Sequence, residues 1–418
     1  MSLRVGIVSL GCPRNLVDSE SILSRLKEKN ITITKLEEAD VAIVNTCAFI
    51  KEAKQESIDT LLNLIELKEQ GYIKKIVVYG CLVQRYKNEL PRNLKGVDAF
   101  VGKINLNGSF ATKPSLTSRH FAYVKISEGC GNFCSYCIIP KIKGRLHSRE
   151  QDSIIQQVKA LDKHRVKEIN LVGQDIALYG LDRCGRPRLA KLVKDILRHT
   201  HNIRWIRLLY LHPAHIDDEL IDLIAKEKKI CKYVDLPIQH INDRILKLMN
   251  RGISKTEIIS LIKKIRRRVK GVYLRTSIIT GFPGETEAEF NELLDFLRKM
   301  KFERLGAFIY SREEGTKAYS FKGQVHYKTK KARFGRVMSV QRDIASKCNE
   351  TLLGKKREVM IDARDEEDAN LYLARLEQDA PEVDGIVYVK SKKRLLPGEF
   401  HKVKIVDSLE YDLVGELS

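Results

Sequence analysis

The chain has 418 residues, 43% hydrophobic and 31% charged, a composition typical of a globular protein with sizeable cores. No apolar run approaches the ~20 residues that cross a membrane, and the N-terminal MSLRVGIVSLGC has the pattern of a strand rather than a signal peptide. We therefore expect a cytoplasmic protein of about three domains. Its nine cysteines then indicate metal binding or catalysis rather than disulfides.

The net charge of +21 is unevenly distributed. Residues 351–418 contain 11 Lys and Arg against 15 Asp and Glu, a net of −4, so the preceding residues carry +25. A basic majority favours an anionic partner such as nucleic acid or a ribosomal surface. It also fits an ordinary solvated surface, and KKIRRR at 263–268 is most simply the wet face of a helix.

Three short β-branched runs open the chain, and each ends in a cysteine: RVGIVSLGC, DVAIVNTC and KKIVVYGC. Such runs are typical of parallel strands buried on both faces, and helical patterns follow at 19–29 and 51–70. In a parallel α/β sheet the carboxyl strand ends share one edge, where ligands bind. We therefore expect Cys12, Cys47 and Cys81 to converge there as a three-thiolate site, although a single buried cysteine is often only a small core residue.

A polar segment at 103–120 has the composition of a linker, and a second β-α series follows it. Six strand-like runs alternate with helical stretches such as 153–164 and 290–300. Six units fit an open partial barrel better than a closed eight-unit one. The predicted strands lie within 121–130, 168–175, 205–213, 232–240, 272–285 and 304–315.

After Cys348 the pattern changes to short strands separated by turns. REVMIDAR, NLYLARLEQ, GIVYVK and EFHKVKIVD predict a small antiparallel β-barrel. The chain is thus predicted to be α/β with three domains: a parallel sheet domain at 1–116, a partial (βα)6 barrel at 117–346, and a β-barrel at 347–418.

The run GCGNFCSYC places Cys130, Cys134 and Cys137 on one loop after the first barrel strand. Three thiolates can ligate three irons of a cubane cluster and leave the fourth iron open for a ligand. A zinc site or three buried thiols are the alternatives, but structural zinc prefers four protein ligands. Cys184, Cys231 and Cys348 match no pattern and are expected to be structural.

This loop resembles the signature of the radical S-adenosylmethionine (SAM) enzymes, CxxxCxΦC, in which the aromatic position is Tyr136 here. The resemblance implies a 4Fe-4S cluster whose open iron binds SAM, and reductive cleavage of SAM to a 5′-deoxyadenosyl radical. It also implies that Tyr136 lies beside the adenine, while core packing is its other explanation. Gln174 and Gly281, both at strand ends, are further candidate SAM contacts, with loop geometry as the alternative.

The complete layout resembles the methylthiotransferases, which join a three-cysteine domain, a radical SAM barrel and a TRAM domain. The resemblance implies a second 4Fe-4S cluster at Cys12, Cys47 and Cys81, where sulfur is delivered. Within the family, SLGCPRNLVDSE, CAFIKEAKQESIDT, GCLVQRY and APEVDG resemble the branch that modifies ribosomal protein S12. The tRNA-modifying branch usually reads more like GCQMNxxDS at the first cysteine.

The expected reaction is methylthiolation of an aspartate β-carbon in ribosomal protein S12, with SAM as methyl donor and radical source and with an external electron donor. The acidic last domain favours this basic partner over tRNA, although DARDEEDAN also fits a solvated loop. A tRNA adenosine methylthiotransferase is the main alternative. An electron carrier or cluster-storage protein would not explain a SAM-type loop on a barrel.

Overall fold

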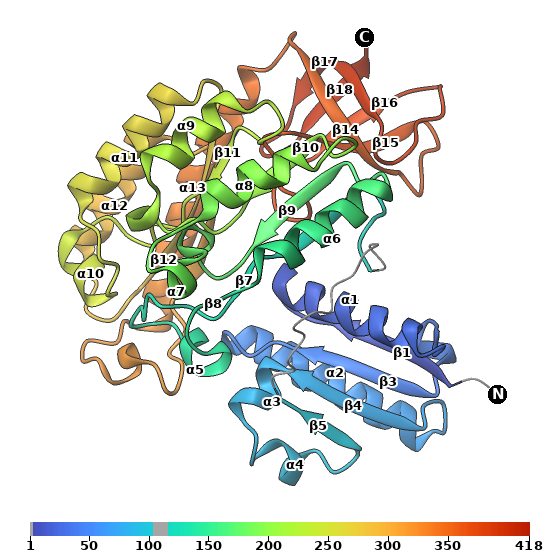
Figure 1. The fold of residues 1–418 in the computed structure, drawn as a ribbon. Coiled ribbons are helices and arrows are strands. Elements are labelled where there is room, and N and C mark those ends of the chain that lie inside the picture. Colours follow the sequence, from blue (N-terminus) through green and yellow to red (C-terminus); the bar gives the residue numbers. More distant parts are fainter. Residues whose placement is uncertain (1–2, 103–115) are drawn as a thin grey trace.

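The computed structural model describes residues 3–102 and 116–418, and it begins with a parallel five-stranded sheet of order β2-β1-β3-β4-β5 (Figure 1). The three predicted strands are confirmed as β1 (Arg4–Ser9), β3 (Val41–Thr46) and β4 (Lys75–Gly80), and short β2 (Thr32–Ile33) and β5 (Ala99–Val101) extend the sheet. Its helices are α1 (Pro13–Glu28), α2 (Lys51–Glu69), α3 (Cys81–Arg85) and α4 (Leu90–Asn93).

The central region contains the six predicted parallel strands in sequence order. They form two three-stranded sheets, which the parallel bridge between Ile206 and Ile230 connects into one open arc. The strands are β6 (Phe121–Lys125), β9 (Glu168–Val172), β10 (Trp205–Leu208), β11 (Tyr233–Asp235), β12 (Tyr273–Thr280) and β13 (Arg304–Ile309). The long covering helices are α6 (Gln151–Lys163), α8 (Leu189–Arg198), α9 (Asp218–Lys226), α11 (Lys255–Arg268) and α12 (Glu287–Met300). The expected partial barrel is therefore confirmed.

The basic helix α11 is largely neutralised by its neighbours. Arg266 pairs with Glu303 at 2.6 Å, and Lys264 and Arg268 both reach Asp218, at 2.9 and 3.3 Å. KKIRRR therefore contributes less free positive surface than its sequence implies.

The last five strands close into a small barrel, and helix α13 (Tyr327–Glu350) leads into it. The strands are β14 (Lys356–Arg364), β15 (Leu371–Leu376), β16 (Val387–Lys390), β17 (Phe400–Ser408) and β18 (Leu413–Leu417). The predicted small β-barrel is confirmed, but it is mixed: four of its five neighbouring pairs are antiparallel, and β16 and β18 pair in parallel. Strand direction cannot alternate all the way around a closed ring of five strands, so at least one neighbouring pair must run parallel.

The two outer units cover opposite ends of the partial barrel (Figure 1). One buried apolar cluster contains Val17 of α1, Tyr123 and Tyr233 of the central strands, and Met360 of β14. The carboxyl strand ends face the N-terminal sheet, where Lys125 forms an ion pair with Asp18 of α1. The barrel interior is therefore filled from both ends.

A buried ionic network joins the C-terminal barrel to the amino ends of the central strands. Glu168, the first residue of β9, accepts from Arg207 at 2.9 Å and from Arg375 at 2.8 Å, and its side chain is fully buried. Arg304, the first residue of β13, pairs with Asp379 at 2.6 Å. The paired, hydrogen-bonded geometry is what makes burying these charges tolerable.

The predicted domain boundaries stay predictions. Most of the predicted linker, 103–115, lies outside the described residues, and the boundary at 346/347 falls within helix α13. No helix in the described part of the chain is long and apolar enough to cross a membrane.

Candidate active site

Cys12, Cys47 and Cys81 follow β1, β3 and β4 at one edge of the N-terminal sheet, as predicted. Each occupies the turn from a strand toward a helix: Cys12 is the N-cap of α1, and Cys81 opens α3. The turn at Gly11 has a φ of +88°, and a β-carbon there would lie 2.9 Å from Cys47 Sγ. The glycine before Cys12 is therefore required both by the left-handed backbone and by the close approach of the second thiol.

Asn15 connects all three of these strand ends from the first turn of α1. Its side-chain amide donates to the carbonyl oxygens of Leu10 at 3.0 Å and Thr46 at 3.3 Å, and its Oδ1 lies 3.9 Å from Cys81 Sγ. The residue is 2% exposed. Asn15 therefore fixes the relative positions of the three thiols.

The second set lies on the loop after β7 (Ser127–Glu128). Backbone hydrogen bonds shape this loop: Cys130 N donates to Gly144 O at 3.1 Å, and Cys137 N to Cys134 O at 3.0 Å. Asn132 N lies 3.5 Å from Cys130 Sγ, and Arg251 Nη1 lies 3.5 Å from both Cys134 Sγ and Tyr136 Oη. Backbone and guanidinium donors thus reach the thiol sulfurs, as they do around metal-bound thiolates.

Helix α5 (Ile139–Lys143) follows Cys137 directly and brings the two sets together. Ile138 and Ile142 are buried in the same apolar cluster as Cys81. The ammonium of Lys143 forms ion pairs with Asp18 of α1 at 3.4 Å and with Glu128 of β7 at 3.1 Å. The loop of the second set is therefore built partly into the core of the sheet that carries the first.

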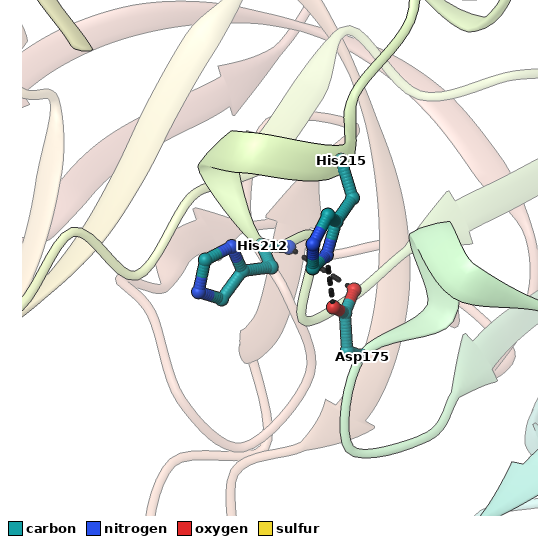
Figure 2. Close-up of side chains that lie close together, drawn as sticks. All are labelled: Asp175, His212 and His215. Carbon is teal, nitrogen blue, oxygen red and sulfur yellow. Dashed lines mark hydrogen bonds and ion pairs between the residues drawn. The ribbon is translucent and has the colours of Figure 1, made fainter. Parts of the chain in front are cut away.

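Asp175 lies three residues beyond the end of β9, and its side chain hydrogen-bonds to the neighbouring strand ends and to the loop of the second cysteine set. Figure 2 shows His215 facing the Asp175 carboxylate while the ring of His212 points away from it. The carboxylate accepts from His215 Nδ1 at 2.7 Å, the Asn132 side chain at 2.9 Å, Ala177 N at 3.2 Å and His212 N at 3.3 Å. With four donors its oxygens are fully used, so the arrangement is a hydrogen-bonded hub rather than a metal site.

The predicted SAM contacts differ in their surroundings. Tyr136 packs against a buried cluster with its hydroxyl near Arg251. The Oε1 atom of Gln174 is buried and has no hydrogen-bond partner among the described residues, which is unusual for a native polar atom. The Gly281 amide donates to Glu285 at 3.1 Å, and the Lys330 side chain packs over this glycine. All three roles stay predictions.

Arg275 of β12 lies in a largely buried ion-paired group. It contacts Asp235 at 3.1 Å and Asp384 of the C-terminal barrel at 3.5 Å. Among the unpatterned cysteines, Cys231 is buried as a structural residue should be, whereas Cys184 is exposed, so that expectation was wrong there. All nine cysteines are free thiols.

Three successive parts of the sequence match known families. Residues 4–102 match Uncharacterized protein family UPF0004, 124–297 the Radical SAM superfamily, and 353–417 the TRAM domain. The chain is 44% identical to the ribosomal protein uS12 methylthiotransferase RimO of Clostridium novyi, over 99% of this chain and 97% of that one. It is 46% identical to the enzyme of that name from Caldicellulosiruptor saccharolyticus, over 99% and 100%.

This chain belongs to the radical SAM methylthiotransferase family. Solved structures with related folds are more distant. The radical SAM methyltransferase TsrM from Kitasatospora setae superposes with a TM-score of 0.52 at 14% identity, over 73% of each chain. The cobalamin-dependent SAM radical enzyme OxsB gives 0.51 at 12% identity, over 83% of this chain and 56% of that one. These two share the fold alone.

Membership of the radical SAM methylthiotransferases implies a 4Fe-4S cluster and SAM, and the second cysteine set fits such a cluster. Burial raises the pKa of Cys130 to about 11 and that of Cys137 to about 12. Both would be protonated at neutral pH without a metal, so a bound cluster would be needed to make them thiolates. Among the described residues, only Asp175, His212 and His215 bring three ligand atoms within 4.8 Å of one another.

Several residues around the cysteines of this methylthiotransferase were missed by sequence reasoning. They contact cysteines or their loops without matching a ligand pattern. Only Asn15 had a signal in the sequence, because it belongs to a run of polar residues on the face that α1 buries. These residues are Arg14, Asn15, Asn132, Asp175 and Arg251.

Proposed function

We propose that this methylthiotransferase acts on ribosomal protein S12 and adds a methylthio group to an aspartate β-carbon. The observation that carries the proposal is identity of 44–46% with the two uS12 enzymes over 99% of this chain. Similarity of that extent includes both cysteine-bearing regions and the last domain. A protein substrate assembled with the ribosome also agrees with action in the cytoplasm.

We assign one 4Fe-4S cluster to each cysteine set. A cluster at Cys130, Cys134 and Cys137 would supply reductive cleavage of SAM to a radical, given an external electron donor. One at Cys12, Cys47 and Cys81 would hold the sulfur that is methylated and transferred. The protein's own part is to orient these groups and exclude water. Tyr136, Gln174 and Gly281 are the proposed SAM contacts.

The first set offers three thiols at neighbouring strand ends of one sheet edge. Burial raises the pKa of Cys81 to about 12 and also raises that of Cys47. Two of the three thiols would therefore stay protonated at neutral pH without a metal, as in the other set. Their placement around one buried asparagine supports a shared ligand rather than three separate packing residues.

The acidity of the last domain supports a protein substrate over tRNA. Fewer of its acids are free to meet a partner than the composition implies, because several form ion pairs with the rest of the chain. Five of its acids pair with basic groups outside residues 351–418. The exposed acids that remain include Glu366, Glu367 and Asp368, on the turn between β14 and β15. The five acids that pair with groups outside the domain are Glu358, Asp362, Asp379, Asp384 and Glu410.

A direct test offers both substrates to the reconstituted enzyme. Purified S12 and unmodified tRNA are incubated together with SAM and a reductant, and each is analysed by mass spectrometry. We expect S12 to gain one methylthio group, located at an aspartate by fragmentation. A methylthiolated adenosine in tRNA with unchanged S12 would establish the alternative substrate instead.

A further inference from the structure

Arg14 lies two residues beyond Cys12 and reaches out of its own domain. Its Nη1 donates to the carbonyl oxygen of Gly173 at 3.0 Å, at the carboxyl end of β9. Its guanidinium carbon lies 4.5 Å from the ring centroid of Tyr210, just beyond β10. Arg14 therefore contacts two neighbouring strand ends of the partial barrel from the first turn of α1.

The same side chain also reaches the first cysteine set. Arg14 Nε lies 3.5 Å from Cys12 Sγ. Cys12 is thus in direct contact with a cation that also touches the partial barrel.

The barrel residues that Arg14 touches are next to the radical site. Gly173 directly precedes Gln174 and Asp175, and Asp175 accepts from Asn132 on the loop of Cys130 at 2.9 Å. Tyr210 adopts a left-handed φ of 66°, and its carbonyl accepts from Ile176 N at 3.2 Å. A chain of direct contacts therefore runs from Cys12 through Arg14 to the loop that carries the second set.

We propose that Arg14 is a positioning residue that couples the two cysteine sets, holding the sulfur of Cys12 in register with the strand ends beside Cys130, Cys134 and Cys137. This inference rests on the proposed two-cluster function. The guanidinium suits the task because its fixed fork can donate in two directions while its face stacks on an aromatic ring. A hydrogen bond and a positive charge at a ligating sulfur also raise the reduction potential of an iron–sulfur cluster.

The first experiment measures the reduction potential of the first cluster in a variant that cannot carry out catalysis. In a chain with Cys130, Cys134 and Cys137 all changed to Ala, only the first cluster remains, and its potential is measured by redox titration followed by electron paramagnetic resonance. Arg14→Gln should shift this potential to a more negative value, because a donor and a charge are lost. Arg14→Lys should restore much of the potential, because the charge is kept.

In the chain with both sets intact, Arg14→Gln should uncouple the reaction. We expect 5′-deoxyadenosine to form near the wild-type rate, while methylthiolated product per 5′-deoxyadenosine falls about tenfold or more. Arg14→Lys should restore this ratio only in part, because one ammonium cannot reproduce the fork. Lys54→Gln is the matched control: it also removes a contact between the two domains, to Glu313 at 2.7 Å, but leaves the cysteines untouched, and both readouts should stay at wild type.

The proposal is wrong if Arg14→Gln leaves both quantities at their wild-type values: the reduction potential of the first cluster and the amount of methylthiolated product per 5′-deoxyadenosine. Loss of the first cluster from Arg14→Gln but not from Arg14→Lys would support it, because the charge at Cys12 would then be needed for assembly. If both Arg14 variants lose the first cluster while Lys54→Gln keeps it fully, Arg14 is also placed at the first cluster. If the chain that keeps Arg14 but lacks the second set binds no iron, the two-cluster function itself fails, which is a separate outcome.

Discussion

The Asp175 carboxylate accepts a hydrogen bond from the side chain of Asn132 at 2.9 Å. This contact ties the carboxyl end of β9 to the loop between Cys130 and Cys134. The same carboxylate accepts from His215 Nδ1 at 2.7 Å. One buried acid therefore holds together the strand ends on which the radical chemistry depends.

Asp175→Asn should slow SAM cleavage by about 10- to 100-fold, because the amide nitrogen cannot accept from Asn132 and His215 as the carboxylate does. Iron content should stay at about eight atoms per chain. The measurement is the rate of 5′-deoxyadenosine formation. Asp217→Asn is the control: Asp217 caps α9 through Leu220 N at 2.8 Å, and asparagine caps equally well. An unchanged rate in Asp175→Asn would show that the hub is not needed.

Glu168→Gln should lower the free energy of unfolding by about 3 kcal/mol or more, because two buried guanidinium groups lose their shared anion. Chemical denaturation of the variant and the parent measures the change. Glu219→Gln is the matched control. It removes an ion pair of similar length, 2.7 Å to Lys194, but the Glu219 side chain is 58% exposed. We expect a loss below about 1 kcal/mol there. Equal losses in the two variants would contradict the role of burial.

The contribution of Glu168 should depend on pH in a defined direction. Burial acts to raise the pKa of this carboxyl, but the charges of Arg375 and Arg207 outweigh it and hold the pKa below its usual value. The stability it contributes is therefore complete above the unfolded pKa of about 4.3 and is lost as pH falls through the lower folded value. The difference in unfolding free energy between wild type and Glu168→Gln should be constant from pH 7 to about 5 and shrink below about 4.3. A difference that grows with acidification would be inconsistent with this sign.

The exposed acidic turn should guide association with S12. Changing Glu366, Glu367 and Asp368 to Lys should slow association about tenfold at low salt, and the effect should fade as salt is raised. Stopped-flow mixing with S12 measures the rate constant. The control reverses three exposed acids on the barrel helices, which should leave the rate nearly unchanged: Asp218, Glu219 and Asp295. Equal effects of both triple changes would indicate only a response to net charge.

Sequence patterns predicted the strands that carry Cys12, Cys47 and Cys81 because each strand is a short apolar run that ends at a cysteine. Cys12, Cys47 and Cys81 could be placed at one sheet edge from β-α repetition alone. The short edge strands β2 and β5 were missed because two or three residues carry no measurable periodicity. The parallel pair β16–β18 depends on how the barrel closes, which local pattern does not encode.

The residues around the ligands could not be predicted because their partners are distant in sequence. Arg14 meets Gly173 across 159 positions, and Arg251 meets Cys134 across 117. Charge counting was similarly incomplete. Asp379 and Asp384 count toward the net acidity of residues 351–418, yet they pair with Arg304 and Arg275 in the folded protein.

The most direct test of separate roles for the two cysteine sets compares two triple variants. One changes Cys12, Cys47 and Cys81 to Ala, and the other changes Cys130, Cys134 and Cys137 to Ala. Each is reconstituted with iron and sulfide and incubated with SAM, reductant and S12, and 5′-deoxyadenosine and methylthiolated S12 are both quantified. We predict that the first variant forms 5′-deoxyadenosine but leaves S12 without a methylthio group, and that the second forms neither product. Methylthiolated S12 from the first variant would contradict the assignment of sulfur delivery to Cys12, Cys47 and Cys81.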